Sequence, residues 1–405
     1  MLIKKPTDFK HFYLSYILML SLPILPFIVG AKVQWATHVL LIFTLILESR
    51  KLMISKYGKW IVLLVISIIV SFYTSLSAEY NLIIQSLFYL LTPYLMIVLG
   101  IQMGVVFKKE SDILKYIVYH GTVGAMLFLI VGIFTAGSAL FNDIYQLRHI
   151  ILWGSITNVI AIIILLFHNK LDQVIVQKAS WRKVFIVINI LALALTASRT
   201  YYLIFFIFLL LVLFRYRKTA FLSISVILCL VMVFILSIET DNLFILKIQN
   251  AVSEISNTRE FSGYDDVGAY YRAYETQQAM KTYNSGTEAE LIFGHGLDKL
   301  VDLNIYVDLA GTERRFIPVL HNGYAYLLIR TGILGVILFG LFFLRAFFIK
   351  IINSNTSLYY LIYLGTLISL IISNYVIGSF FSSEMFFGWV IVGLYFLLAS
   401  KPKLT

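Results

Sequence analysis

The chain has 405 residues, of which 60% are hydrophobic and only 13% are charged. No soluble domain of this length has that balance, so the composition excludes a soluble globular fold and indicates a polytopic membrane protein. The net charge of +11 does not indicate a nucleic-acid partner, because most Lys and Arg residues stand in short clusters between apolar runs. The single cysteine, Cys229, lies inside an apolar run, which excludes a disulfide framework and a cysteine-based metal site.

Apolar runs recur along the chain, and a transmembrane helix needs about 20 such residues. We predict an all-α polytopic membrane protein with about twelve transmembrane helices. The first run lacks a convincing small-residue cleavage site, so we expect a retained span and not a cleaved signal peptide. The predicted spans lie near residues 12–30, 33–48, 60–77, 82–105, 116–135, 150–168, 184–198, 200–214, 219–238, 320–347, 358–378 and 384–399.

The basic clusters between the apolar runs predict the orientation. With twelve spans every cluster falls on one side of the membrane, so both termini are expected to be cytoplasmic. Residues 184–214 are long for one span and short for two, and basic clusters flank them on both sides. We therefore predict a tight hairpin with its outer turn at residues 197–200, which places Arg199 at or slightly below the outer membrane surface.

The spans divide the chain into three parts: residues 1–238 with about nine spans, an extracytoplasmic loop at 239–318, and residues 319–405 with about three spans. The loop holds 13 of the 21 acidic residues. A loop of that length inside a compact protein is usually functional or disordered.

Apolar residues of the loop recur at helical spacing over residues 244–255 and 267–274, and Asn284-Ser285-Gly286 is a helix stop signal. A turn, Phe293-Gly294-His295-Gly296, follows. We predict a small helical cap over the outer face of the bundle.

Motifs for nucleotide or metal chemistry are missing: the sequence has no P-loop, no HExxH, no Cys/His cluster and no D-x-D pair. Asp265-Asp266 is a weak metal signal that a helix N-terminus explains as well. We therefore expect neither a metal nor a cofactor.

Arg199 interrupts an apolar stretch, and a charge in that position is costly and therefore functional by default. Together with the Ser198 and Thr200 hydroxyls it forms a suitable lining for a phosphate. The alternative is a snorkelling arginine that anchors a helix end.

Arg272 lies in the second predicted helix of the loop, where the plain alternative is a surface pair with Glu275 three residues on. Arg259 is a further basic candidate in the loop.

His321 stands where the polar loop re-enters an apolar run. A neutral imidazole at such a helix mouth can take a proton from a hydroxyl near neutral pH. The alternative is an interfacial histidine whose hydrogen bonds are satisfied. Gly332 and Gly335 predict close helix packing behind it.

Three motifs follow one another in the chain: Leu195-Thr196-Ala197-Ser198-Arg199, then Phe293-Gly294-His295-Gly296, then His321-Asn322-x-Tyr324 with a Gly-x-x-Gly pair behind it. Their order, with the span number and the loop position, resembles the O-antigen polymerase and O-antigen ligase superfamily along nearly the whole chain. In that family, saccharide moves from an undecaprenyl-pyrophosphate donor outside the cytoplasmic membrane, in a reaction that is metal-independent and described as inverting.

The resemblance implies that His321 activates the acceptor hydroxyl and that Arg199 binds the donor pyrophosphate. It favours Arg272 as the loop arginine of the family, with Arg259 as the competing match. Family members often carry Glu where this chain has Arg330, which leaves the role of that position open. The further expected substrate-binding residues are Ser198, His295, Asn322 and Tyr324.

We therefore expect a Wzy-type polymerase for capsule or O-antigen repeat units in the bacterial cytoplasmic membrane, with an outward-facing active site. The expected partners are the undecaprenyl-pyrophosphate-linked oligosaccharide, membrane lipid, a chain-length regulator and a flippase, and no nucleic acid. The alternatives are a ligase of the same superfamily, a transporter or flippase, and a non-catalytic assembly scaffold. A transporter favours paired internal repeats and broken helices, whereas polar residues here concentrate on one predicted face.

Overall fold

The computed structural model describes residues 13–28, 31–49, 58–72, 74–75, 80–107, 110–136, 156–171, 175–196, 198–237, 261, 267, 270–308, 312–349 and 358–400. Most of these residues are helical. The helices of the bundle are α1 (Tyr13–Ser21), α2 (Leu25–Ile28), α3 (Ala31–Ser49), α4 (Ile61–Phe72), α5 (Tyr80–Val106), α6 (Glu110–Ala136), α9 (Ile156–Leu166), α10 (Ala179–Leu195), α11 (Arg199–Tyr216), α12 (Lys218–Ser237), α17 (Gly323–Phe347), α18 (Leu358–Ile377) and α19 (Phe386–Ser400). Short 3₁₀ turns are η2 (Gly58–Trp60), η3 (His168–Lys170) and η4 (Ser383–Met385).

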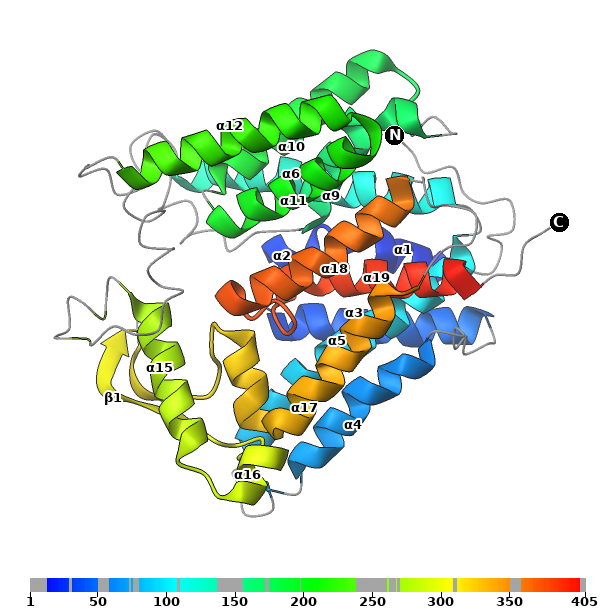
Figure 1. Cartoon of the computed structure of the whole chain (residues 1–405). Coiled ribbons are helices and arrows are strands. Elements are labelled where there is room, and N and C mark those ends of the chain that lie inside the picture. Colours follow the sequence, from blue (N-terminus) through cyan, green and yellow to red (C-terminus); the bar gives the residue numbers. More distant parts are fainter. Residues whose placement is uncertain are drawn as a thin grey trace.

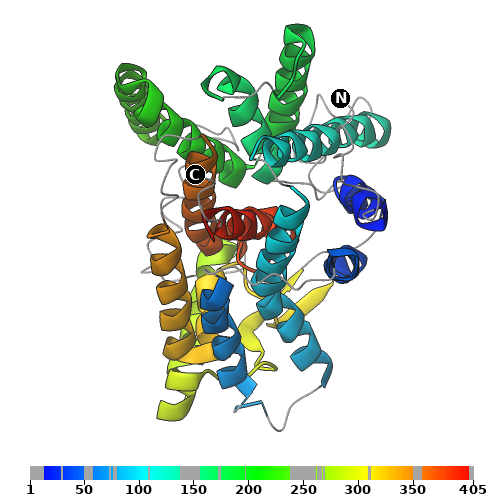
Figure 2. The same ribbon diagram turned by 90° about the vertical axis from the view of Figure 1, so that its right-hand side faces the viewer.

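A second group of elements lies between α12 and α17 in the chain. It consists of α15 (Tyr271–Asn284), α16 (Glu288–Phe293), β1 (Val301–Asp308) and β2 (Glu313–Ile317). In both ribbon views these elements gather beside the first half of α17, on the opposite side of the molecule from α12 (Figures 1 and 2).

Five helices within the described residues are long and apolar enough to cross a membrane, by length and composition: α5, most of α6, α11, α17 and α18. Large apolar side chains remain exposed on the bundle, among them Phe134, Ile133 and Leu230. An apolar outer surface on apolar helices is typical of a protein surrounded by lipid. The structure thus supports a membrane protein, while the count of twelve spans stays a prediction.

The segment that we predict to be a hairpin forms two helices, α10 and α11, and the backbone of Ser198 between them is extended. The Tyr202 hydroxyl donates to the Ala194 carbonyl oxygen at 2.7 Å and ties the two helices together near the break. Two helices in residues 184–214 are therefore confirmed, and two membrane crossings remain a prediction.

Glycines set the closest helix contact of the bundle, between α5 and α19. A Cβ atom on Gly100 would lie 2.1 Å from the Val390 carbonyl oxygen, and one on Gly393 would lie 2.0 Å from the Ile97 carbonyl oxygen. Only residues without a side chain permit backbones to approach this closely. On the other side of the bundle, Phe208 of α11 packs against Gly365 of α18.

The prediction of a purely helical protein is wrong for Val301–Asp308 and Glu313–Ile317, which form an antiparallel two-stranded sheet. Val301 pairs with Ile317, and Asp308 pairs with Glu313. The sequence signal was present, because apolar residues alternate with other residues along β1, which is the period of a strand and not of a helix. The cap between α12 and α17 is therefore a mixed structure of helices and a hairpin, and its extracytoplasmic position stays a prediction.

The second predicted helix of the loop is confirmed as α15, and it ends at Asn284, at the predicted stop signal. The next helix, α16, begins with a capping box in which Thr287 and Glu290 satisfy each other's backbone N–H groups. The first predicted loop helix, residues 244–255, lies outside the described residues.

Candidate active site

The first turn of α17 is built around Asn322. Its side-chain oxygen accepts from the backbone N–H groups of Tyr324 at 3.0 Å and Ala325 at 3.2 Å, which is the geometry of an N-cap. Gly323 packs directly against Asn374 of α18, where a Cβ atom would lie 2.1 Å from the amide oxygen. Because Asn322 ends the extended chain and begins the helix, His321 is held just outside the helix mouth.

His321 contacts a buried carboxylate of α15. The Glu275 side chain is 1% exposed, whereas the His321 side chain is 47% exposed. One oxygen of Glu275 accepts from the His321 backbone N–H at 2.5 Å, and the other lies 2.8 Å from Nδ1 of the imidazole. An ionised carboxylate only accepts hydrogen bonds, so Nδ1 carries the proton and Nε2 keeps a lone pair. No described residue hydrogen-bonds to Nε2.

Two further residues of α15 meet the same stretch. The Asn322 amide nitrogen donates to the Thr276 hydroxyl oxygen at 3.3 Å. The Tyr271 ring stands edge-on to the imidazole with ring centres 5.8 Å apart. Burial, and then the charge of Glu275, raise the pKa of Tyr271, so that its hydroxyl stays neutral.

Glu275 is the functional residue that the sequence did not reveal. The interpretation of Glu275 as the surface partner of Arg272 is wrong, because the carboxylate is buried and both of its oxygens contact His321. The two residues are 46 positions apart in the chain, so no local spacing rule pairs them.

The hairpin supports α15 from the side opposite α17. The Tyr274 hydroxyl donates to the Leu303 carbonyl oxygen, and the Asn304 amide nitrogen donates to Gln278 at 3.1 Å. A two-bond pair between Arg315 and Asp302, at 2.8 and 2.7 Å, joins the two strands. The hydrogen bonds from Arg315 lower the pKa of the Asp302 carboxyl.

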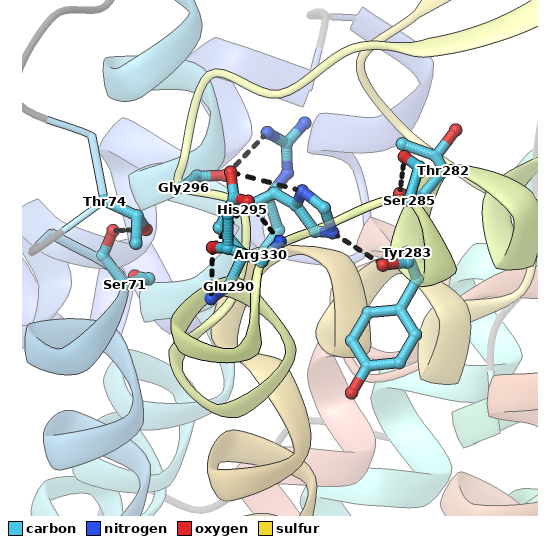
Figure 3. A network of polar contacts seen from close by, with 10 residues as sticks. Ser71, Thr74, Thr282, Tyr283, Ser285, Glu290, His295, Gly296 and Arg330 are labelled. Carbon is cyan, nitrogen blue, oxygen red and sulfur yellow. Dashed lines mark hydrogen bonds and ion pairs between the residues drawn. The ribbon is translucent and has the colours of Figure 1, made fainter.

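The Phe-Gly-His-Gly turn packs against a kink in α17. Figure 3 shows His295 and Gly296 of this turn beside Arg330 of α17. Gly332 interrupts the helix with a positive φ of 63°, and a Cβ atom there would lie 2.2 Å from the Ile292 carbonyl oxygen. Gly294 has a φ of 93° and faces the Arg330 carbonyl oxygen equally closely. Both positions require glycine. The predicted close helix packing at Gly332 is therefore confirmed as a contact with the last turn of the short helix α16 and with the turn that follows it.

His295 lies inside this turn, with its side chain 1% exposed. Its Nε2 lies 3.0 Å from the Tyr283 carbonyl oxygen, and its Nδ1 lies 3.6 Å from the Glu290 carboxylate. Its backbone N–H donates to the Ile329 carbonyl oxygen at 2.7 Å. The structure thus gives His295 a role in holding the turn. Because its side chain is buried there, His295 is not assigned a substrate contact.

Arg330, whose role the sequence left open, is 2% exposed. Its guanidinium donates to the Gly296 carbonyl oxygen at 3.1 Å and to the Pro318 carbonyl oxygen at 2.6 Å, and it lies over the Tyr326 ring. These two carbonyl groups precede and follow the hairpin. Arg330 therefore fastens both ends of the hairpin to α17, and one of these ends, Pro318, lies three residues before His321.

Arg199 begins α11, and Ser198 beside it is buried. The Tyr201 hydroxyl, half a helical turn on, donates to Glu384 at 3.3 Å. Gly378, six residues before Glu384, lies against the His321 backbone, where a Cβ atom would be 3.4 Å from the carbonyl oxygen. The short segment after α18 therefore places Arg199 and His321 at the same end of the bundle.

Arg272, Tyr324 and Arg259 are the remaining predicted site residues. Arg272 is partly buried in the first turn of α15, next to Tyr271. The Tyr324 hydroxyl donates to the Ile371 carbonyl oxygen at 2.6 Å. Arg259 lies outside the described residues.

Taken together, the fold defines a polytopic α-helical membrane protein with a mixed cap and a histidine–carboxylate pair at one helix mouth. Residues 184–340 match the Wzy_C family, which is described as O-antigen ligase. The matched region runs from α10 through the cap into α17 and contains both Arg199 and His321. Neither a curated protein nor a solved structure matches the chain. The match supports the O-antigen ligase and polymerase superfamily, and hence a membrane enzyme of the glycosyltransferase type; it does not separate a polymerase from a ligase.

Proposed function

We propose that this protein is a polysaccharide polymerase on the outer face of the bacterial cytoplasmic membrane. It transfers glycan from an undecaprenyl-pyrophosphate-linked donor to a lipid-linked repeat-unit acceptor. The supporting observation is a half-exposed imidazole, held through one ring nitrogen at the mouth of α17, at the same end of the bundle as Arg199.

His321 is the general base of the proposed reaction. Its Nε2 takes the proton of an acceptor hydroxyl while the hydroxyl oxygen bonds to the anomeric carbon of the donor. The bond from that carbon to the pyrophosphate oxygen breaks, and its electron pair leaves with the undecaprenyl pyrophosphate. Attack from the face opposite the leaving group inverts the configuration at that carbon.

Arginines bind the donor pyrophosphate in this proposal. Pyrophosphate is a good leaving group, so an acid catalyst is dispensable where cations stabilise its developing charge. Arg199 is assigned this role at the membrane boundary, and Arg272 is assigned it from the cap, with Arg259 as the competing loop arginine. A planar guanidinium suits the role because it binds phosphate oxygens in pairs. Ser198 and Asn322 line the same end of the bundle.

A ligase of the same superfamily fits the match equally well and differs only in its acceptor. A transporter or flippase is the alternative from another class, for which alternating access between paired repeats is the expected mechanism.

The test is an assay of purified protein in detergent micelles with lipid-linked repeat units. We expect wild-type protein to form oligomers on the lipid, His321→Ala to lower the rate by at least about 10²-fold, and a chelator to leave the rate unchanged. His168→Gln, in η3, is the matched histidine control. His321→Ala protein that folds and elongates glycan at the wild-type rate excludes the proposed base.

The arginine assignment has its own control on the same helix. Arg199→Ala should raise the KM for the lipid-linked donor by at least about tenfold, the effect of losing about 1.4 kcal/mol of binding. Arg217, exposed at the other end of α11, provides the matched control Arg217→Ala.

Polymerase and ligase are separated in cells. Loss of a polymerase leaves single repeat units on the lipid, whereas loss of a ligase leaves long lipid-linked polymer without its final acceptor. A deletion strain that accumulates long polymer assigns the ligase function instead.

A further inference from the structure

Both oxygens of the buried Glu275 carboxylate contact the same residue, His321. The carboxylate binds both the backbone N–H and Nδ1 of this residue. A buried ionised carboxylate is costly unless hydrogen bonds satisfy it. Here the catalytic histidine of the proposed reaction provides them.

We propose that Glu275 is the positioning residue of the base: from cap helix α15 it orients the His321 imidazole and keeps its proton on Nδ1, so that Nε2 accepts the proton of the acceptor hydroxyl. This inference rests on the proposed function, because it presupposes that His321 is the base. A carboxylate that holds the far nitrogen of a catalytic imidazole also stabilises the imidazolium that forms during proton transfer.

Among the described residues, one carboxylate contacts the imidazole. From α15, Glu275 contacts Nδ1 and Tyr271 stands edge-on to the ring, and Tyr271 stays neutral. The segment after α18 that lies against the His321 carbonyl group, residues 378–381, carries no titratable side chain. Glu275 is therefore the charged group that the described structure places on a ring nitrogen of His321.

The base is consequently assembled from two parts of the chain. His321 belongs to the mouth of α17, whereas Glu275 belongs to the cap, which docks through Thr276 on Asn322 and through Tyr274 on the hairpin. The histidine alone is half exposed and has no other partner for its ring nitrogens among the described residues. A cap that is not docked leaves His321 without its orienting group.

Glu275→Gln is the most direct test, because it keeps the shape and removes the charge. An amide nitrogen facing Nδ1 donates, which favours the tautomer with the proton on Nε2 and removes the accepting lone pair. We expect kcat to fall by between about 10² and 10⁴-fold with little change in KM. Glu288→Gln is the matched control: it makes the same substitution at an exposed carboxylate in the first turn of α16, away from the imidazole, and should leave kcat unchanged.

A second measurement needs no substrate. NMR of protein with ¹⁵N-labelled histidine reports at one fixed neutral pH which ring nitrogen carries the proton, and comparison with His321→Ala assigns the signals of His321. We expect His321 to carry its proton on Nδ1 in wild type and on Nε2 in Glu275→Gln. Glu275→Asp, which keeps the carboxylate, serves if Glu275→Gln does not fold, and should keep the proton on Nδ1 while lowering kcat.

The outcomes distinguish the two proposals. Inactive His321→Ala together with a fully active Glu275→Gln, in which His321 keeps its proton on Nδ1, overturns the role of Glu275 and leaves the base in place. An active His321→Ala overturns the proposed function itself.

Discussion

Gly332→Ala tests how tightly the cap depends on the kink in α17. Gly332 has φ 63° and ψ −171°, a region that is essentially restricted to glycine, and forcing another residue into it costs about 1–3 kcal/mol. The new Cβ atom would also lie 2.2 Å from the Ile292 carbonyl oxygen, so the turn must move away. Losing the hydrogen bond from His295 N–H to Ile329 adds about 1 kcal/mol.

The expected destabilisation is therefore about 2–4 kcal/mol, which is large for one methyl group. Gly340 provides a control in the same helix, because a Cβ atom there has no neighbour within 4 Å. Gly340→Ala should be neutral or stabilise by up to about 1 kcal/mol through helix propensity. The assay is thermal unfolding in detergent at one fixed scan rate, since such unfolding is governed by a rate.

We expect the apparent Tm of Gly332→Ala to fall by several degrees and that of Gly340→Ala to stay or rise. The transfer rate should fall with the first variant only, because the displaced turn carries the hairpin that supports α15. Equal Tm and equal activity for the two variants would refute the docking of the turn as the element that holds the cap.

Three further predictions concern the supports of the site. Asn322→Ala should lower stability by about 1 kcal/mol through loss of the N-cap, and Asn322→Asp should retain it, as measured by the same Tm assay. Arg330→Met removes the donor of two carbonyl groups, which costs about 1–3 kcal/mol for each group and is partly offset because no charge is buried any longer. Amide exchange over residues 297–318 should therefore become faster. Arg330→Lys should not fully restore the protection, because lysine lacks the planar guanidinium that donates to both groups. Arg315 lowers the pKa of Asp302 from its ordinary 3.8, so this pair stabilises the hairpin at neutral pH, and the stabilisation is lost as the pH falls through the lowered pKa. Amide exchange in β1 and β2 should become faster only in that acidic range. Asp302→Asn should abolish this pH dependence of the exchange.

Local pattern located the helices well. The end of α15 follows from a stop signal, the start of α17 from an Asn cap, and the break between α10 and α11 from a charge. All three signals act within a few residues. The hairpin was readable from the alternation in β1 and was missed because helical spacing upstream suggested a uniformly helical cap. His321 and Arg199 stood out because polar groups at the edge of apolar runs are costly.

The sequence by itself determined the membrane class and the positions of the helices. The reason is that an apolar run in lipid must form its backbone hydrogen bonds within itself, and a helix forms them between residues four positions apart. What only the tertiary structure decided is the partnership of the polar residues. Glu275 reaches His321 across 46 positions, and Arg330 reaches carbonyl groups on both sides of the hairpin. The physical reason is burial. When the cap docks, each buried charge needs hydrogen-bond partners, and the tertiary packing decides which groups lie within reach. The spacing of residues in the sequence does not identify these groups.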